Sequence, residues 1–332
     1  MIIGMTDERE HDTGDLAPIR GNIRAPGFRR VSHGLYLPTG TSGEARHEQL
    51  RDLGAWQLVL PPDAVFTHVT AADLCGWWLP KLPRSVPVFA ATTIHGNIPR
   101  RAGLICSRLT RSSVIGIADG LPVDSPYEIL LRAARDLGLI DLVVMLDSAL
   151  RFGHVEPDKL DEYCHSGRPG SRLLRNAVAL SDPRSESAWE TMLRLFHEAV
   201  AIDVEPQYDI EDDAGRFAAR VDLWVKGTPF VHEYDGDEHE KAPRRKADLR
   251  RARRLLDAGA ERRGYVADDL LNHPRAMLQE MDRELGRPHR PARLRRWYAW
   301  LRESSYSMAG RRRLQNRWLK VTGRGTDWGR TA

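Results

Sequence analysis

Several features that would set this chain apart from ordinary globular proteins are absent from its sequence. Its three cysteines, Cys75, Cys106 and Cys164, are widely spaced and odd in number, which argues against a disulfide framework or a zinc knuckle. No apolar run is long enough to cross a membrane, and the polar first twenty residues lack the apolar centre of a signal peptide. We therefore expect a cytoplasmic protein without a membrane partner.

The charge of the chain is unevenly distributed. A length of 332 residues suggests two or three domains, and 41% hydrophobic with 29% charged residues is ordinary for a soluble protein. From Arg287 to the end, 13 Lys/Arg and two acids give a balance of +11, so that a net charge of +4 leaves −7 for the rest. Four of the nine tryptophans also lie in this segment, which we call the basic tail (residues 287–332): Trp297, Trp300, Trp318 and Trp328.

Two interpretations of the basic tail stay open. Basic residues interleaved with aromatic rings can bind a nucleic-acid backbone and stack on bases. Alternatively, the tail is a partly disordered basic segment with a short amphipathic helix near residues 291–303.

Residues 220–239 concentrate acidic side chains in one predicted hairpin. Val221, Leu223 and Val225 alternate with polar or aromatic positions, residues 227–229 read Gly-Thr-Pro, and a second alternating run follows over 230–235. This pattern predicts two strands joined by a turn. Side chains two residues apart on a strand share a face, so Glu233 and Asp235 should lie together, within reach of Asp222.

Converging carboxylates repel one another unless a cation or a proton neutralises them. Hard oxygen ligands suit Mg²⁺ or Mn²⁺, which makes Asp222, Glu233 and Asp235 the candidate metal ligands. His239 follows in the next loop and is the candidate proton acceptor, since a histidine pKa lies near neutrality. The competing interpretation is an acidic, solvated surface hairpin, because Asp-Gly is a common turn pair.

A cationic helix is predicted directly after the hairpin. It begins near Pro243 and ends at Gly259, with Ala247, Ala252, Leu255 and Leu256 as its narrow apolar face. Arginines next to a metal-binding hairpin are suited to holding DNA phosphates, although they can also simply solubilise a helix. The candidate DNA-binding residues are Arg244, Arg245, Arg250, Arg251 and Arg254.

A further acidic residue lies on the helix predicted over 187–200. Ser187 is its expected N-cap, and Glu190 follows three residues later, which is the spacing of a capping box. Glu190 can therefore either cap the helix or contribute to the metal site. A strand over 261–267 and a closing helix over 268–285 are expected after the cationic helix.

The spaced anchors of this half carry a family resemblance. They are Ser187-x-x-Glu190, Gln207, Asp222, Glu233-Tyr234-Asp235-Gly236, His239 and Asp248-x-x-Arg251-x-x-x-Leu255-x-x-x-Gly259. Over about residues 183–285 the chain resembles the very-short-patch-repair-like branch of the PD-(D/E)XK nuclease superfamily. The resemblance implies a small mixed sheet flanked by helices, restriction-endonuclease-like, that hydrolyses DNA phosphodiesters with Mg²⁺.

The resemblance also implies roles for particular residues. Asp222 becomes the central metal ligand, with Glu233, Asp235, Glu190 and His239 completing the catalytic set. Asp235 departs from the pattern, because a lysine is usual there. His239, Lys241 or Lys246 could supply the missing charge.

The N-terminal half contains no catalytic constellation over residues 1–180, and His68 is expected to pack against its neighbours. A hairpin is predicted over 28–37 with Gly34 in the turn. Arg29-Arg30, Gly34-Leu35-Tyr36, Thr70-Ala71-Ala72 and Gly76 are similar to the AbiEi-like antitoxin and transcriptional-regulator family. The resemblance implies a winged helix, here truncated at its start because few ordered residues precede the hairpin.

These patterns predict a mixed α/β (α+β) chain with a defined order of parts. We expect a disordered start (1–18), an AbiEi-like region (19–180), an endonuclease-like domain (183–286) and the basic tail. The favoured function is a Mg²⁺-dependent DNA endonuclease of defence or repair, with the N-terminal region contacting DNA or a protein partner. The alternative is a non-catalytic, antitoxin-like DNA-binding regulator with a degenerate nuclease domain.

Overall fold

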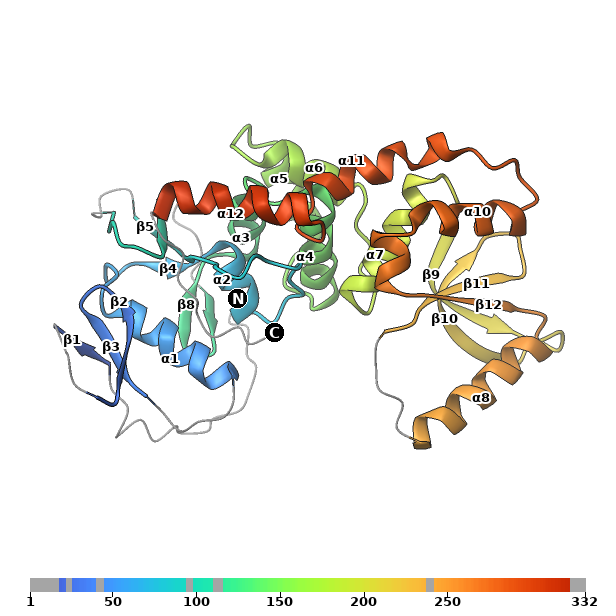
Figure 1. Cartoon of the computed structure of the whole chain (residues 1–332), viewed down its shortest axis with the longest axis horizontal. Coiled ribbons are helices and arrows are strands. Elements are labelled where there is room, and N and C mark those ends of the chain that lie inside the picture. The colour runs from blue at the N-terminus through green and yellow to red at the C-terminus, as the bar shows by residue number, and fades with distance from the viewer. Residues whose placement is uncertain are drawn as a thin grey trace. The chain divides into compact units, whose positions relative to one another are not determined.

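The structure is a computed structural model that describes residues 18–21, 26–39, 45–93, 98–109, 116–236 and 242–322, and in 242–247 the backbone alone. The chain is a mixed α/β protein, as the sequence predicts. Among these residues it contains sheets of three, four and five strands. It divides into two compact units (Figure 1). The first unit draws on residues 1–137, 157–174 and 311–332, and the second on 138–156 and 175–310. The predicted disordered start lies outside the described residues, except for residue 18.

The first unit contains two sheets. The smaller has the order β1-β3-β2, and its hairpin is the predicted one, with Gly34 at φ +66°. The larger has the order β6-β5-β4-β8-β7. The strands are β1 (Ile19–Arg20), β2 (Phe28–Ser32), β3 (Leu35–Pro38), β4 (Val65–Phe66), β5 (Val88–Thr92), β6 (Leu104–Arg108), β7 (Gly116–Ala118) and β8 (Leu121–Val123).

Helices of the first unit form where polar caps precede apolar runs. Ser125 caps the third helix by accepting a hydrogen bond from the Glu128 amide, and Pro126 occupies its first turn. The helices are α1 (Ala45–Gln57), α2 (His68–Leu74), α3 (Pro126–Ala133), α5 (Pro157–Cys164), the first half of α6 (Ser171–Val178) and most of α12 (Met308–Thr322).

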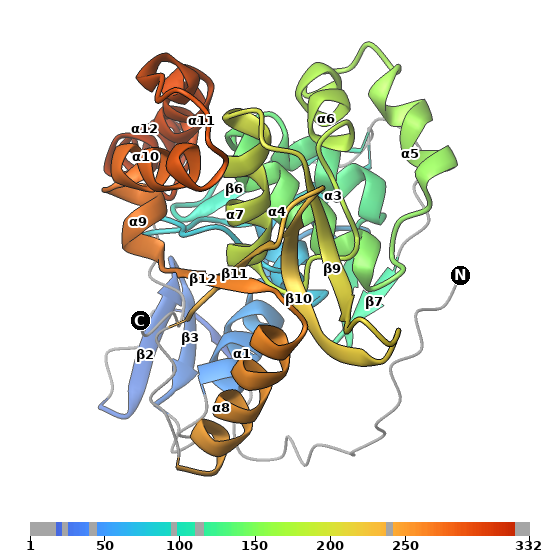
Figure 2. The same cartoon turned by 90° about the vertical axis from the view of Figure 1, so that its right-hand side faces the viewer.

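The second unit is built on a four-stranded sheet of order β12-β11-β10-β9. The first three strands along the chain pair antiparallel, and β12 pairs parallel to β11 after a helical crossover. Helices α7 and α8 cover opposite faces of this sheet (Figures 1 and 2). The elements are α4 (Leu139–Arg151), α7 (Ala188–Ala199), β9 (Val204–Glu211), β10 (Phe217–Val225), β11 (Phe230–Tyr234), α8 (Ala242–Asp257), β12 (Glu261–Tyr265), α9 (Ala267–Leu271), α10 (Pro274–Glu284), η1 (Pro291–Leu294) and α11 (Arg295–Glu303).

Two expectations for this unit need correction. The single closing helix over 268–285 is two helices, because Pro274 cannot continue α9 and instead opens α10. The expected apolar face of α8 is narrower than predicted: Leu255 is buried, whereas Leu256 is 72% exposed and Ala252 is also exposed.

The basic tail is helical up to residue 322, and two of its four tryptophans belong to the core. Trp297 is fully buried and donates a hydrogen bond to the Leu270 carbonyl (3.1 Å), and Trp318 is 2% exposed. Asp282, also buried, binds three side chains of the same segment, Arg287, His289 and Arg293. Trp297 and Trp318 therefore pack inside the fold and are not free to stack on bases, whereas most of the described basic side chains of the tail are exposed. Trp328 lies outside the described residues.

Trp318 joins α12 to the strands of the first unit. Its Nε1 donates a hydrogen bond to Asp136 (3.0 Å), and its ring packs edge-to-face against the rings of Phe89 and His68. His68 stacks on Phe89 at a centroid distance of 4.0 Å, which places this histidine in packing, as predicted. Among the described residues, no helix is long and apolar enough to cross a membrane.

Trp318→Ala should lower the free energy of unfolding of the first unit by about 3–5 kcal/mol, because it removes a buried indole and its hydrogen bond. Met308→Ala on the same helix is the control, since Met308 is 82% exposed. Urea denaturation followed by circular dichroism measures both. If the two variants unfold at the same urea concentration, Trp318 does not hold α12 in place.

Candidate active site

The hairpin of β10 and β11 brings Asp222 and Glu233 together. Gly227 adopts φ +75° in the connecting turn, a conformation that glycine enters without strain. Leu223 pairs with His232 across the two antiparallel strands, so continuing this register by one residue sets Asp222 opposite Glu233. The predicted strands and turn are thus confirmed, and the two acids are cross-strand neighbours.

Alternate side chains of β11 point to opposite faces of the sheet, toward two different helices. His232 bonds to His197 (2.7 Å between Nδ1 and Nε2), and Tyr234 stacks on Trp189, so both point toward α7. Glu233 points to the other face, where Arg251 of α8 bonds to its carboxylate. Strand geometry therefore separates an aromatic, packed face from an acidic face covered by α8.

Glu190 of α7 has a clear structural role. Ser187 caps the helix, its hydroxyl accepting from the Glu190 amide (3.1 Å), as the spacing predicts. The Glu190 carboxylate accepts from the Glu186 amide (2.7 Å) and from the Gln207 side chain (2.9 Å). Burial raises the pKa of Glu190, and Glu186 nearby adds to that rise. The carboxylate thus tethers α7 to β9 whether or not it also binds a metal.

Asp222 is the most perturbed acid of the hairpin. Burial and the negative charges of Glu190 and Glu233 together raise its pKa to about 7, against the opposing effects of the Tyr234 amide and Arg251. The Tyr234 amide donates to its Oδ2 at 2.9 Å. Asp222 therefore lies close enough to Glu190 and Glu233 for their negative charges to act on it.

Glu233 has neutralising partners that Asp222 lacks. Arg251 bonds to it at 2.9 Å through one nitrogen, and Arg262 of β12 forms a second ion pair with it. Although burial opposes this, the hydrogen bonds from both arginines keep the pKa of Glu233 below its ordinary value. The first acid of the pair is thus poised to take a proton or a cation, and the second is already paired.

Arg262 was missed from the sequence. It also forms an ion pair with Asp235, so one guanidinium joins the last two acids of the hairpin. The feature that could have identified Arg262 is the parallel pairing of β11 with β12. Val231 pairs with Arg262, which puts Arg262 on the same sheet face as Glu233 and Asp235. That pairing depends on the α8 crossover, which no local pattern specifies.

Gly264 is required where Asp235 meets β12. A β-carbon at position 264 would fall on the Asp235 carboxylate, so any other residue would displace it. The Asp235 amide donates to the Tyr265 carbonyl (2.8 Å), which extends the strand pairing past the end of β11. Asp235 is therefore held against β12 by main chain and side chain together.

The arginines of α8 divide into two groups. Arg251 bonds to Glu233, and the Nε of Arg254 donates to the Ala218 carbonyl (2.7 Å), so both bind the sheet. Arg250 is exposed. The side chains of Arg244 and Arg245 lie outside the described part of the chain, as do His239 and Lys241 and the side chain of Lys246.

In the described part of the chain, no group of three or more His, Cys, Asp or Glu side chains is arranged to hold a metal ion. The donor chemistry still fits Mg²⁺ in part, because Asp222 and Glu190 offer carboxylate oxygens without an ion pair to a described cation. Glu233 could join them only by releasing its arginines. Comparison with protein-family models, curated proteins and solved structures gives no match for the chain.

Asp222→Asn should make the second unit more resistant to unfolding at alkaline pH. Because the pKa of Asp222 is raised to about 7 from 3.8, its contribution to stability is complete below about pH 4 and is lost as the pH rises through 7. The stabilising effect of Asn should therefore grow by up to about 3 kcal/mol between pH 5 and pH 8.

Thermal unfolding at several pH values measures this effect. Asp209→Asn is the control, since Asp209 is exposed on β9 of the same sheet. An advantage of Asp222→Asn that does not change with pH would contradict the raised pKa.

Proposed function

We propose that this protein is a metal-dependent DNA endonuclease whose active site is the acidic face of the β10–β11 hairpin. The observation that carries the proposal is Asp222, a half-buried acid with a pKa raised to about 7 and no ion pair to a cation of the described part of the chain. A carboxylate in that state gains stability from any divalent cation that reaches it. Acids of this kind, strongly perturbed in one cluster, are more common at functional sites than in structural ion pairs.

The chain supplies two kinds of group for phosphodiester hydrolysis. Asp222 and Glu190 are the carboxylates that would hold Mg²⁺ or Mn²⁺, with Glu233 and Asp235 as the further acids of the set. When bound, the metal lowers the pKa of a water molecule and polarises the phosphoryl group. His239 remains the proposed proton acceptor, next to the cluster in sequence.

Asp235 stands where the resembled family usually has a lysine, so the positive charge of the site would come from its arginines. Arg262 lies between Glu233 and Asp235, so its guanidinium occupies the acidic face where a lysine is usual in the resembled family. We propose that Arg262 and Arg251 transfer from the carboxylates to phosphate oxygens when DNA and metal arrive. Guanidinium groups bind carboxylates and phosphates with the same two-pronged geometry, which makes such an exchange chemically simple.

The wider proposal concerns fold and context. Three features favour a restriction-endonuclease-like domain. They are the mixed sheet, the helices on its two faces and the order α7, β9, β10, β11, α8, β12. Arg244, Arg245, Arg250 and Arg254 are proposed to add DNA contacts. A cytoplasmic location and an AbiEi-like first unit that binds DNA or a protein partner complete the proposal.

Cleavage of supercoiled and linear DNA tests the enzyme directly. The wild-type chain should nick DNA with Mg²⁺ or Mn²⁺ but not with EDTA, and Asp222→Asn should lose at least about 100-fold in rate. Arg262→Met should lose about 10- to 100-fold, since it removes one stabilising charge. Arg172→Gln removes an exposed arginine from the part of α6 that belongs to the first unit, and this variant should cleave like the wild type.

Metal binding has a readout independent of cleavage. At pH 8, Mg²⁺ should raise the thermal unfolding temperature of the wild-type chain and leave that of Asp222→Asn unchanged, because the ion stabilises an ionised Asp222. Cleavage at equal rates by wild type and Asp222→Asn would show that the active site lies elsewhere.

The second candidate is the non-catalytic, antitoxin-like regulator. It is favoured by the two arginines on Glu233, which relieve part of the repulsion in the cluster without any metal. Salt-sensitive DNA binding with neither cleavage nor a Mg²⁺ effect on unfolding would support the regulator and refute the endonuclease.

A further inference from the structure

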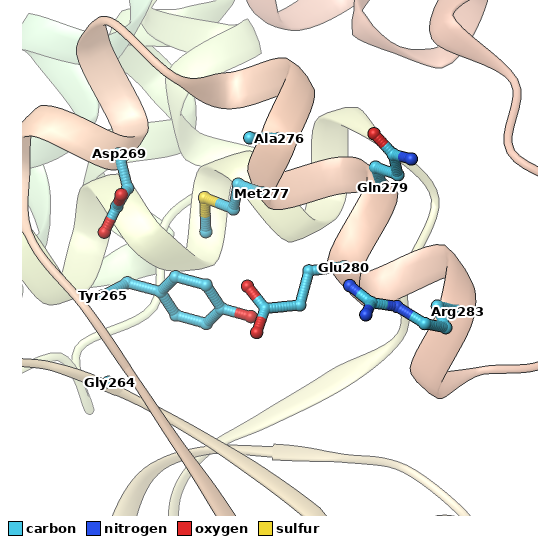
Figure 3. A pocket seen from close by; sticks show the side chains of 8 residues that line it. All are labelled: Gly264, Tyr265, Asp269, Ala276, Met277, Gln279, Glu280 and Arg283. Atoms are coloured by element: carbon cyan, nitrogen blue, oxygen red, sulfur yellow. The ribbon is translucent and has the colours of Figure 1, made fainter.

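A pocket of about 600 Å³ opens beside the candidate active site, between the end of β12 and helices α9 and α10. Its volume is in the range of small-ligand sites. Figure 3 shows Tyr265 pointing from the strand toward the Glu280 carboxylate, with Met277 at one side of the ring. The lining residues are Gly264, Tyr265, Asp269, Ala276, Met277, Gln279, Glu280 and Arg283.

The phenol hydroxyl at the bottom of this pocket has no partner. Tyr265 is only 3% exposed, and its hydroxyl oxygen makes no hydrogen bond to any described group. Burial raises the pKa of Tyr265, and the carboxylates of Glu284 and Glu280 raise it further, so the hydroxyl keeps its proton. A buried hydroxyl without a partner is unfavourable, and a polar ligand atom in the pocket would satisfy it.

Two side chains of α10 give the pocket groups of opposite charge. Glu280 offers a carboxylate beside Tyr265, at 3.8 Å from its nearest cation, Arg263. Arg283, one turn further along the helix, is exposed and makes no ion pair with a described residue. The pocket thus presents a carboxylate and a guanidinium, with the Met277 thioether beside the Tyr265 ring (Figure 3).

The pocket and the candidate active site share a wall. Gly264 lines the pocket, while the space beside its α-carbon is filled by the Asp235 carboxylate. The Asp235 amide donates to the Tyr265 carbonyl, so the two sites are joined through one strand pair. The pocket lies on the α7 side of β12, because Tyr265 pairs with Tyr234, whereas the acidic site lies on the α8 side of the same strand pair.

We propose that this pocket holds a single unpaired nucleotide of the DNA strand, with cytosine or adenine as its base. A carboxylate accepts hydrogen bonds from the exocyclic amino groups of these bases and repels the O4 of thymine or uracil. Arg283 binds the nucleotide's phosphate, and Met277 contacts the base ring. The role of the pocket in a DNA strand rests on the proposed function, whereas its preference among nucleotides does not.

Calorimetric binding of dCMP and dUMP to the full chain in EDTA tests the pocket. These nucleotides differ at position 4, where dCMP carries an amino group and dUMP a carbonyl, so dCMP should bind about tenfold more tightly. Glu280→Gln should abolish or reverse this preference, because its amide can donate to the uracil carbonyl. Asp268→Asn on α9 removes an acid outside the pocket and should keep the preference.

Tyr265→Phe separates binding from folding. It should weaken dCMP about fivefold through the lost hydrogen bond, without lowering the unfolding temperature, because the hydroxyl has no partner in the free protein. A lower unfolding temperature would show that the hydroxyl is structural and would overturn the assignment. Arg283→Ala should weaken dCMP but leave deoxycytidine, which lacks the phosphate, unaffected.

Equal binding of dCMP and dUMP by the wild type, or the absence of saturable binding, would refute the nucleotide pocket. Asp222→Asn should bind dCMP like the wild type. A chain that cleaves DNA but does not distinguish the nucleotides sinks the pocket alone. A chain that prefers dCMP but neither cleaves nor responds to Mg²⁺ sinks the endonuclease alone.

Discussion

The repulsion between Asp222 and Glu233 is the constraint on which the second unit depends. The antiparallel register of β10 and β11 sets them opposite each other, and neither can turn away without losing the strand pairing. The negative charges of these two acids are compensated in different ways. Arg251 and Arg262 neutralise Glu233, whereas Asp222 retains a proton up to a pH of about 7. One acid of the pair therefore stays responsive to protons and cations.

The arginines that stabilise Glu233 also organise the unit. Arg251 connects α8 to β11 and to the Arg220 carbonyl of β10, and Arg262 connects β12 to β11. The charge pairing thus holds the crossover helix and the parallel strand on one side of the hairpin. Removing Glu233 would leave two guanidinium groups facing each other, so this acid serves the fold even if it never binds a metal.

Local patterns predicted the elements of this site better than its contacts. The alternation over 221–225 and 230–235, the turn at Gly227 and the Ser187 cap are all confirmed, since each depends on residues close in sequence. Arg262 was not predicted, because its partners Glu233 and Asp235 lie 29 and 27 residues away. The burial of the C-terminal tryptophans was not predicted for the same reason.

Composition describes the basic tail as a surface, yet several of its side chains have partners inside the fold. Arg287 and Arg293 meet Asp282, and Trp318 meets Asp136, which lies 182 residues away in the chain. Such pairings depend on topology, which composition does not encode. The break between α9 and α10 was in principle readable from Pro274, and with it the location of the pocket between those helices.

The proton on Asp222 and the arginines on Glu233 have a joint consequence. A divalent ion that binds Asp222 must displace a proton near neutral pH, so affinity for the ion rises as the pH rises through about 7. To recruit Glu233, the same ion must also compete with two guanidinium groups, which then need another anion. In the proposed endonuclease, a DNA phosphate would be the anion that arrives with the substrate. Metal binding and DNA binding should therefore reinforce each other at this site. The metal frees the arginines for the phosphate, and the phosphate binds the arginines that the metal displaces from Glu233.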